Sequence, residues 1–386
     1  MSAGANPAYR VALTDWLACA VGGADEPAAR AARGLGDGLE DRVAAAGTAG
    51  HVLDFDDTYL PGLAHLSAPT APGALVLGAD LDLSLGSAID AYASGFEATG
   101  RLSALNHPAI RERGWHPTAV CGVAGAAVTA ARLLQLDRDG AEAAVRLALL
   151  RAGGLQAAFG SDGKSIQVGL AAAAGMTSAR LAAEGAHAGR EVTAGFEQAY
   201  GARWPDDLLD AAAGDAAVRE NWIKAYPCCL QTHSAIEAAD ILRAESGIPD
   251  GTIVIAVHPV SRLTASRDDV SDGLEAKFSI PYLVAYTLLH RPPDVESFRS
   301  LDPDARVLAE RVAVHTRDDL LESEARLELG GDVVARVEAA LGSPQRPMDA
   351  SGLESKVRSL AGGRLDGLLD DPDRPVRGVL EAAGLG

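Results

Sequence analysis

Lysine is scarce in this chain. Only four of its 34 basic residues are lysine, and the other thirty are arginine; the lysines are Lys164, Lys224, Lys277 and Lys356. An ammonium is compact and can lose its proton near neutral pH, which a guanidinium cannot do. The lysines that remain are therefore candidates for functions that arginine cannot serve, although chance within an arginine-rich composition explains any single one equally well.

Cysteine and aromatic residues are also few. The four cysteines show no C-x-x-C spacing, and the adjacent pair Cys228 and Cys229 cannot readily bridge to itself. This argues against a disulfide framework, a zinc site and a cysteine-held iron–sulfur cluster, so we expect no metal and no cofactor. Aromatic residues make up 4% of the chain. The core must therefore be built from Ala, Leu and Val, which favours closely packed helices.

Positive charge and long apolar runs are lacking as well. The net charge of −19 argues against a nucleic acid as partner, because phosphate binding needs a basic face. A small anionic substrate remains compatible, since a few local cations suffice to bind it. No segment reaches the roughly 18 uninterrupted apolar residues of a membrane span, and the first ten residues lack the order of a signal peptide. We expect a cytoplasmic protein that does not enter a membrane.

The pattern of residues predicts a mainly α protein with two domains. Residues 10 to about 220 read as successive alanine-rich helices, and the tail from Ser351 returns to helix. Between them lie β-branched or alternating runs at 252–259 and 311–315, and a two-glycine hairpin about Gly330 and Gly331. The predicted boundaries give a helical domain of residues 1–221 with 349–386, and a smaller α+β domain of residues 222–348.

The densest polar cluster is H-V-L-D-F-D-D-T-Y-L-P-G-L-A-H-L-S-A-P, residues 51–69. It contains Asp54, Asp56, Asp57, Thr58 and His65. The D-x-D-x-T pattern within it is also that of phosphatases with an aspartyl nucleophile and Mg²⁺, but such sites need a buried strand in front, and the preceding residues predict a helix. A helix cap with solvated aspartates is the other alternative.

Three further segments carry candidate chemistry. His116 follows Trp115 and precedes Pro117, which suits the first turn of a helix, so its pKa would be tuned for proton transfer. Lys164 lies in a glycine-rich turn before a helix, where an amine can bind a carboxylate. Lys224 and His233 flank the predicted domain boundary, where ligand clefts tend to form. Each also has a structural alternative as a capping or packing residue.

Taken together, these segments supply His, Lys and Asp, without a serine elbow, a dinucleotide fingerprint or a set of metal ligands. This inventory suits proton abstraction next to a carboxylate: cations bind the acid and stabilise the enediolate, while His or Asp moves the proton.

Five motifs in order resemble the MmgE/PrpD family. They are D-F-D-D-T with the following H-x-S, G-W-H-P-T-A, G-S-D-G-K, K-A-Y-P-C-C with the following T-H, and E-A-K-F-S-I-P-Y. Members of this family dehydrate 2-methylcitrate, decarboxylate cis-aconitate or epimerise iminodisuccinate. The resemblance implies a helical domain, an α+β lid, an active site at their junction and a homodimer. The site residues it implies are Asp54, Thr58, His65, His116, Lys164 and Lys224, with Tyr282.

Two positions depart from the family pattern. Cys229 stands where the decarboxylase branch has a second histidine, and the Lys164 motif continues I-Q-V-G instead of the H-x-G common in the dehydratase branch. We expect a cofactor-independent lyase, with a hydro-lyase as the leading reaction on a small di- or tricarboxylate. Lys164 and Lys224 would bind the substrate and stabilise the enediolate, with Cys229, His233 and Tyr282 as further substrate contacts. His116 would be the main proton-transfer group, with Asp54, Thr58 and His65 positioning either His116 or the leaving hydroxyl. Alternatives are an epimerase or isomerase, a decarboxylase and a non-catalytic carboxylate-binding protein.

Overall fold

A computed structural model describes residues 6–386 of the chain. It divides into two units, each with its own core. One unit contains residues 6–158, 162–223 and 349–386, and the other contains residues 159–161 and 224–348. The prediction of a mainly α protein with a smaller α+β part is confirmed.

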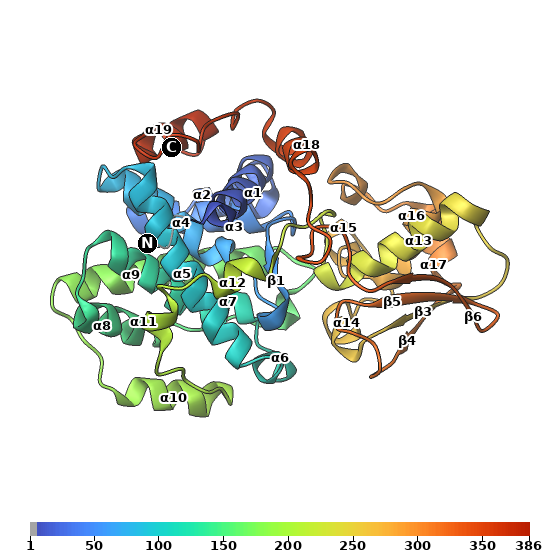
Figure 1. Ribbon diagram of the computed structural model, residues 1–386, viewed down its shortest axis with the longest axis horizontal. Coiled ribbons are helices and arrows are strands. Elements are labelled where there is room, and N and C mark those ends of the chain that lie inside the picture. Colours follow the sequence, from blue (N-terminus) through green and yellow to red (C-terminus); the bar gives the residue numbers. More distant parts are fainter. Residues whose placement is uncertain (1–5) are drawn as a thin grey trace. The chain divides into compact units, whose positions relative to one another are not determined.

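The first unit, called the helical unit below, is built almost entirely of helices (Figure 1). Its helices are α1 (Pro7–Gly23), α2 (Pro27–Arg33), α3 (Leu39–His51), α4 (Ser67–Asp80), α5 (Leu85–Leu105), α6 (Ala109–Glu112), α7 (Pro117–Leu133), α8 (Arg138–Leu149), α9 (Gly163–Ala183), α10 (Glu191–Tyr200), α11 (Leu208–Ala211), α12 (Ala216–Arg219), α18 (Ala350–Ala361) and α19 (Val376–Ala383), with 3₁₀ turns η2 (Leu60–Gly62) and η3 (Gln156–Ala158). Two short strands that the sequence did not predict, β1 (Thr58–Tyr59) and β2 (Asn221–Trp222), pair antiparallel within it.

Small residues let the central helices of this unit approach closely. Helix α9 packs against α3 and α7, and α7 packs against α5; these helices are rich in alanine and glycine. A Cβ on Gly47 of α3 would lie 2.9 Å from the Cα of Gly169 on α9, and a Cβ on Gly169 would meet the backbone oxygen of Ala44. Because any larger side chain would separate α3 from α9, these two glycines determine how near the ends of the two helices lie.

The second unit, called the α+β unit, contains a four-stranded sheet in the order β4-β3-β5-β6. The strands are β3 (Ile253–Val257), β4 (Val312–Thr316), β5 (Ala325–Leu329) and β6 (Asp332–Val337), and the helices and turns are η4 (Leu230–Thr232), α13 (His233–Ser246), α14 (Pro259–Thr264), α15 (Gly273–Ala276), α16 (Ile280–Leu289), η5 (Glu296–Phe298) and α17 (Pro303–Ala309). Strand β3 pairs parallel with β4 and antiparallel with β5, and β5 forms a hairpin with β6. Gly330 and Gly331 both have positive φ (59° and 96°), which this tight turn requires, so the predicted hairpin is confirmed.

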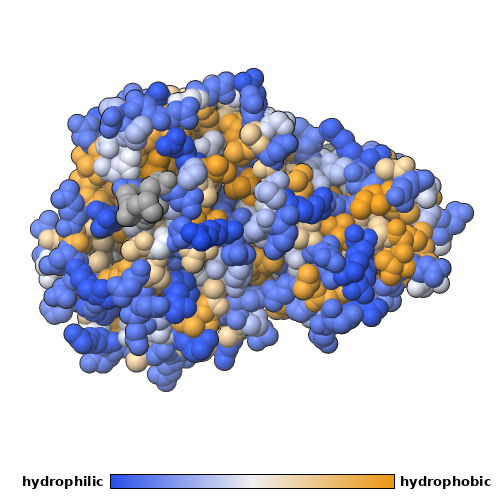
Figure 2. Space-filling model, in the orientation of Figure 1, coloured by the Kyte–Doolittle hydropathy of each residue, from blue (hydrophilic) through white to orange (hydrophobic). Residues whose placement is uncertain are grey.

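Helices α13 and α16 cover this sheet and build its core with it. Helix α13 packs on β5, β6 and α16, and α16 packs on β4 (Figure 1). On the face drawn in Figure 2, hydrophilic residues are interspersed with apolar ones. Across residues 6–386, no helix combines the length and the apolar character needed to traverse a bilayer.

Candidate active site

The polar segment that follows α3 is buried. Asp54, Asp56 and Asp57 are each at most 3% exposed, and they lie between the end of α3 and strand β1. Asp54 has a φ of 54°, a left-handed conformation that Asp tolerates better than most residues. Because helix α3 precedes the motif, the buried strand that a phosphatase of the aspartyl type needs is missing here, and that alternative is wrong. The alternative of solvated aspartates is wrong as well.

Lys164 reaches this segment from helix α9. It lies in the first turn of α9 and not in a preceding loop, which corrects the sequence interpretation. Its Nζ lies 2.8 Å from Nε2 of His51 and 3.2 Å from Oδ1 of Asp54. The close packing of α3 and α9 brings these groups together, since His51 ends α3 and Lys164 begins α9.

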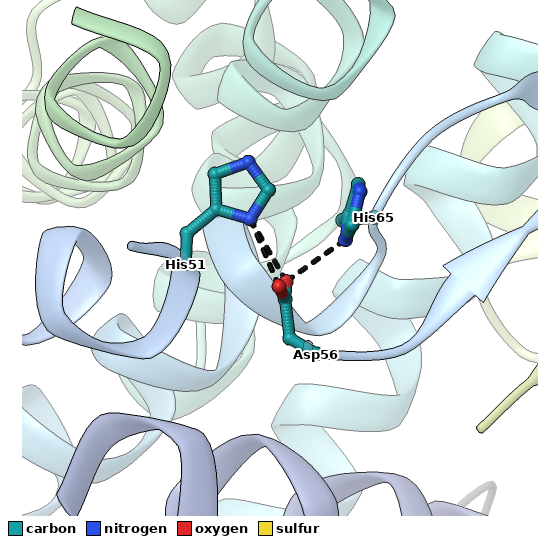
Figure 3. A group of neighbouring side chains, drawn as sticks. All are labelled: His51, Asp56 and His65. Atoms are coloured by element: carbon teal, nitrogen blue, oxygen red, sulfur yellow. Dashed lines mark hydrogen bonds and ion pairs between the residues drawn. The ribbon is translucent and has the colours of Figure 1, made fainter. Parts of the chain in front are cut away.

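The carboxylate of Asp56 joins two histidines (Figure 3). Its Oδ2 lies 2.9 Å from Nδ1 of His51 and 3.0 Å from Nδ1 of His65. Burial would raise the pKa of Asp56, but the neighbouring imidazoles of His51 and His65 outweigh it and hold that pKa well below its usual range. Asp56 is therefore ionised, and each imidazole donates an Nδ1–H to it.

The hydrogen bonds of His51 determine its tautomer and its protonation state. Since its Nδ1 carries the proton donated to Asp56, its Nε2 accepts a hydrogen bond from the Lys164 ammonium. Burial lowers the pKa of His51 and the Lys164 charge adds to this, while Asp56 offsets only part. His51 is thus a neutral imidazole that links a carboxylate to an ammonium.

His65 has a carboxylate near each ring nitrogen. Its Nδ1 donates to Asp56, and its Nε2 lies 3.6 Å from Oδ1 of Asp54. The Oγ1 of Thr58 lies 3.5 Å from the same Nδ1, and the backbone N–H of His65 donates to Oγ1 of Thr118. Two negative neighbours stabilise the ring when Nε2 takes up a proton.

His116 completes the cluster from the N-terminus of α7. It is the N-cap of that helix with Pro117 in the first turn, as predicted, and its ring stacks near that of His51 with centroids 6.0 Å apart. Its Nδ1 lies 2.7 Å from Nε2 of Gln167. Burial holds the pKa of His116 well below its usual range, with the charge of Lys164 as a further cause, so the ring is neutral at physiological pH.

The structure thus brings together five of the predicted site residues: Asp54, Thr58, His65, His116 and Lys164. No sequence pattern pointed to a role for His51 or Gln167. His51 is the first residue of the polar segment, which was a usable signal, but Gln167 reads as an ordinary polar position of a helix. Both gain their roles from contacts with residues far away in the chain.

Within residues 6–386, His51, Asp56 and His65 also form a group of three potential metal ligands, whose donor atoms lie within 4.8 Å of one another. A metal would require both Nδ1 atoms to lose their protons, and it would lie close to the Lys164 ammonium on the other side of His51. The hydrogen bonds to Asp56 therefore account for this cluster without a metal ion.

The remaining predicted site residues belong to the α+β unit. Lys224 is buried, as are Cys229 and His233; Cys229 donates its backbone N–H to the carbonyl of Lys277, and the ring of His233 packs against Tyr226. Tyr282 lies in a small apolar core of this unit, and its hydroxyl accepts a hydrogen bond from the backbone N–H of Asp302. These contacts are those of a core residue.

Comparison with known proteins identifies the family of the chain. The model of the MmgE/PrpD N-terminal domain matches residues 40–203, and that of the MmgE/PrpD C-terminal domain matches residues 226–371. The cis-aconitate decarboxylase of Mus musculus is 28% identical over 345 residues, which are 82% of this chain and 70% of that protein. The cis-aconitate decarboxylase of Homo sapiens is 28% identical over 342 residues, 82% of this chain and 71% of its own. The cis-aconitate decarboxylase-like protein oryM of Aspergillus oryzae is 30% identical over 191 residues, 45% and 39% of the two chains.

Both halves of the chain are therefore covered by one family, in the order in which its five sequence motifs occur. The protein belongs to the MmgE/PrpD family.

Proposed function

We propose that this protein is a lyase that removes a proton next to a carboxylate of a small di- or tricarboxylate, with loss of water as the leading reaction. The observation that carries the proposal is the buried cluster in which Asp56 holds His65 and His51 holds Lys164. Such a cluster supplies a base and a cation at one place, which are the two requirements for forming an enediolate.

His65 is the proposed base. With its Nδ1–H held by Asp56, a proton is gained at Nε2, and the two nearby carboxylates stabilise the imidazolium that results. The electron pair of the broken C–H bond forms the carbon–carbon double bond as the hydroxyl departs. The imidazolium can hand its proton to that hydroxyl, so that water forms and His65 returns to its neutral state.

Lys164 is the proposed electrostatic partner of the substrate. Its ammonium is buried, and its hydrogen bonds to His51 and Asp54 fix its position. A buried cation stabilises the developing enediolate more than an exposed one, because the low local dielectric strengthens the interaction. Lys224 remains a second carboxylate-binding residue in the proposal, on the sequence motif alone.

Decarboxylation of cis-aconitate is the second candidate, because the curated relatives carry that name. Cys229, in place of a second histidine, counts against it. Epimerisation begins with the same proton abstraction and differs in where the proton returns.

One experiment separates these reactions. Citrate, 2-methylcitrate, cis-aconitate and aspartate-derived acids are incubated with the protein in D₂O, and ¹H NMR follows α-proton exchange, alkene signals and product, while released CO₂ is trapped. An alkene formed with exchange and without CO₂ supports the hydro-lyase. CO₂ release from cis-aconitate would favour the decarboxylase, exchange with inversion the epimerase, and binding without exchange a non-catalytic protein.

Two adjacent carboxylates give a matched pair of variants for this assay. Asp56→Asn removes the charge that holds both histidines and is expected to lower turnover by at least about 10²-fold, the scale of acid–base groups. Burial and the charge of Asp56 raise the pKa of Asp57 to about 8, so Asp57 is mostly protonated at pH 7 and Asp57→Asn is expected to stay within about 3-fold of wild type. Equal losses in the two variants would refute the role of Asp56.

A further inference from the structure

Gln167 touches His116 through an amide whose orientation is fixed by the backbone. Its Oε1 accepts the N–H of Leu155 at 2.9 Å, and its Nε2 lies 3.3 Å from the carbonyl oxygen of the same residue. The backbone therefore distinguishes the two ends of the amide, because an N–H must face Oε1 and a carbonyl must face the NH₂ group. The second proton of that NH₂ group is left to point at Nδ1 of His116, 2.7 Å away.

The backbone at Leu155, which binds the amide of Gln167, is itself held in place. Leu155 pairs with Trp115 in a β-bridge, and the backbone N–H of His116 donates to the carbonyl of Gly154. Gly154 has a φ of 120° and lies so close to Gln167 that a Cβ there would come within 3.3 Å of its Cδ. Gln167 and His116 are thus fixed against the same turn.

An amide NH₂ group can only donate, so Nδ1 of His116 must be the acceptor. The proton of the neutral ring is therefore on Nε2. Protonation of Nδ1 would place one N–H against another, and this adds to the burial and the neighbouring cations that already keep the ring uncharged.

We propose that Gln167 is a positioning residue that holds His116 in the Nε2–H tautomer, so that His116 donates a hydrogen bond to the oxygen on which negative charge develops and does not remove the α-proton. This inference rests on the proposed function, and it divides the work between the two histidines. His65 accepts the proton, and His116 stabilises the enediolate without changing its own protonation state. A neutral imidazole that only donates a hydrogen bond keeps its proton during the reaction, so no proton has to be returned to it after each turnover.

The lock depends on the residue type at position 167. An imidazole at this position could either donate or accept. A histidine there would leave the tautomer of His116 open, whereas a glutamine held by Leu155 leaves one choice.

The tautomer can be measured without any substrate. The wild-type protein is labelled with ¹⁵N in its histidines, and long-range ¹H–¹⁵N NMR spectra identify which ring nitrogen carries the proton. The His116 signals are assigned as those missing in His116→Asn. We expect the proton on Nε2, unchanged between pH 6 and 8; a proton on Nδ1 would overturn the proposal.

Gln167→Glu reverses the lock, because a carboxylate can only accept from Nδ1. The ring is then expected to carry its proton on Nδ1, and kcat to fall by about 10²-fold, the usual cost of one donor to an oxyanion, with KM within about 3-fold of wild type. Gln167→Met removes the hydrogen bond but keeps the bulk, so it controls for packing and is expected to leave both tautomers populated.

The outcomes separate this inference from the proposed function. If Gln167→Glu and Gln167→Met both leave the proton on Nε2 alone, Gln167 does not set the tautomer, whatever the activity. If the tautomer switches as expected but no carboxylate in the substrate panel reacts, the lock stands and the proposed reaction fails. A KM that rises while kcat stays constant would assign Gln167 to substrate binding and overturn the positioning role.

Discussion

The buried carboxyl of Asp57 gives a quantitative prediction about stability. Burial and the adjacent charge of Asp56 raise its pKa from 3.8 to about 8, and interactions with Ser67 and Asn221 lower it only in part. Between these two values the folded protein holds a proton that the unfolded chain has released. The free energy of unfolding therefore falls as pH rises, by about 1.4 kcal/mol per pH unit for this one group.

The sign follows from the direction of the shift. The stabilising contribution of the protonated carboxyl is fully present below about pH 4, and it is lost progressively as pH rises to about 8. Asp57→Asn replaces the carboxyl by a neutral group of similar shape, so this dependence disappears in the variant. Between pH 5 and pH 7, the stability of the variant relative to wild type is expected to rise by about 2.7 kcal/mol.

Tryptophan fluorescence can measure the unfolding free energy of the helical unit. All four tryptophans of the chain, at positions 16, 115, 204 and 222, lie in the helical unit that contains Asp57. Urea unfolding of the wild type and the variant would be followed at pH 5, 6, 7 and 8. Asp25→Asn, at a side chain that is 95% exposed, controls for the loss of one negative charge.

The prediction is refuted if the unfolding free energies of Asp57→Asn and of the wild type change in parallel with pH. If the difference in unfolding free energy between Asp57→Asn and wild type does not change with pH, Asp57 is ionised in the folded protein at pH 5 already. The same outcome would remove the basis for using Asp57→Asn as the functional control of Asp56→Asn.

Three other substitutions test separate parts of the structure. Lys356 forms a buried ion pair of 2.6 Å with Asp15, so Lys356→Met leaves a buried charge alone and is expected to cost about 3–5 kcal/mol of unfolding free energy in the same fluorescence assay; a loss below about 1 kcal/mol would contradict this. Gly169→Ala forces α9 away from the backbone oxygen of Ala44. Because this displaces Lys164, we expect kcat to fall by at least about 10-fold. A fully active variant would show that the spacing between α3 and α9 is not critical. Lys224→Ala is expected to reduce turnover by at least about 10²-fold, and near-wild-type turnover would remove Lys224 from the proposed site.

The order of structural elements could be predicted because it depends on local patterns. Alanine-rich helices, the two-glycine hairpin and the change to β-branched runs after about residue 250 are readable in short windows, and the structure contains them. Local cues failed where a neighbouring residue served equally well. The spacing of Ser351 and Glu354 fits a capping box at the first turn of α18, but Asp349 is the N-cap and accepts the N–H of Gly352. The structure starts this helix at Ala350.

The candidate site could be predicted in its residues but not in its connections. The polar types in the segment 51–65 pointed to chemistry, yet the sequence did not show which carboxylate holds which imidazole. The pairing of Asp56 with His51 and His65, and of Gln167 with His116, depends on helices that meet only in the folded chain. The sequence assigned the main proton transfer to His116, whereas these hydrogen bonds favour His65.

The four lysines show what the sequence determines and what only the tertiary structure determines. Their scarcity singled them out, and the structure finds all four at most 7% exposed, although lysine is usually a surface residue. Sequence alone could therefore single out these four positions. It could not separate structural lysines from those of the candidate site. Lys356 pairs with Asp15 and the carbonyl of Phe55. Lys277 lies over the ring of Phe298, whereas Lys164 contacts His51. Only the tertiary structure decided this, because the charge and hydrogen-bond partners that give a buried ammonium its role come from segments far away in the chain.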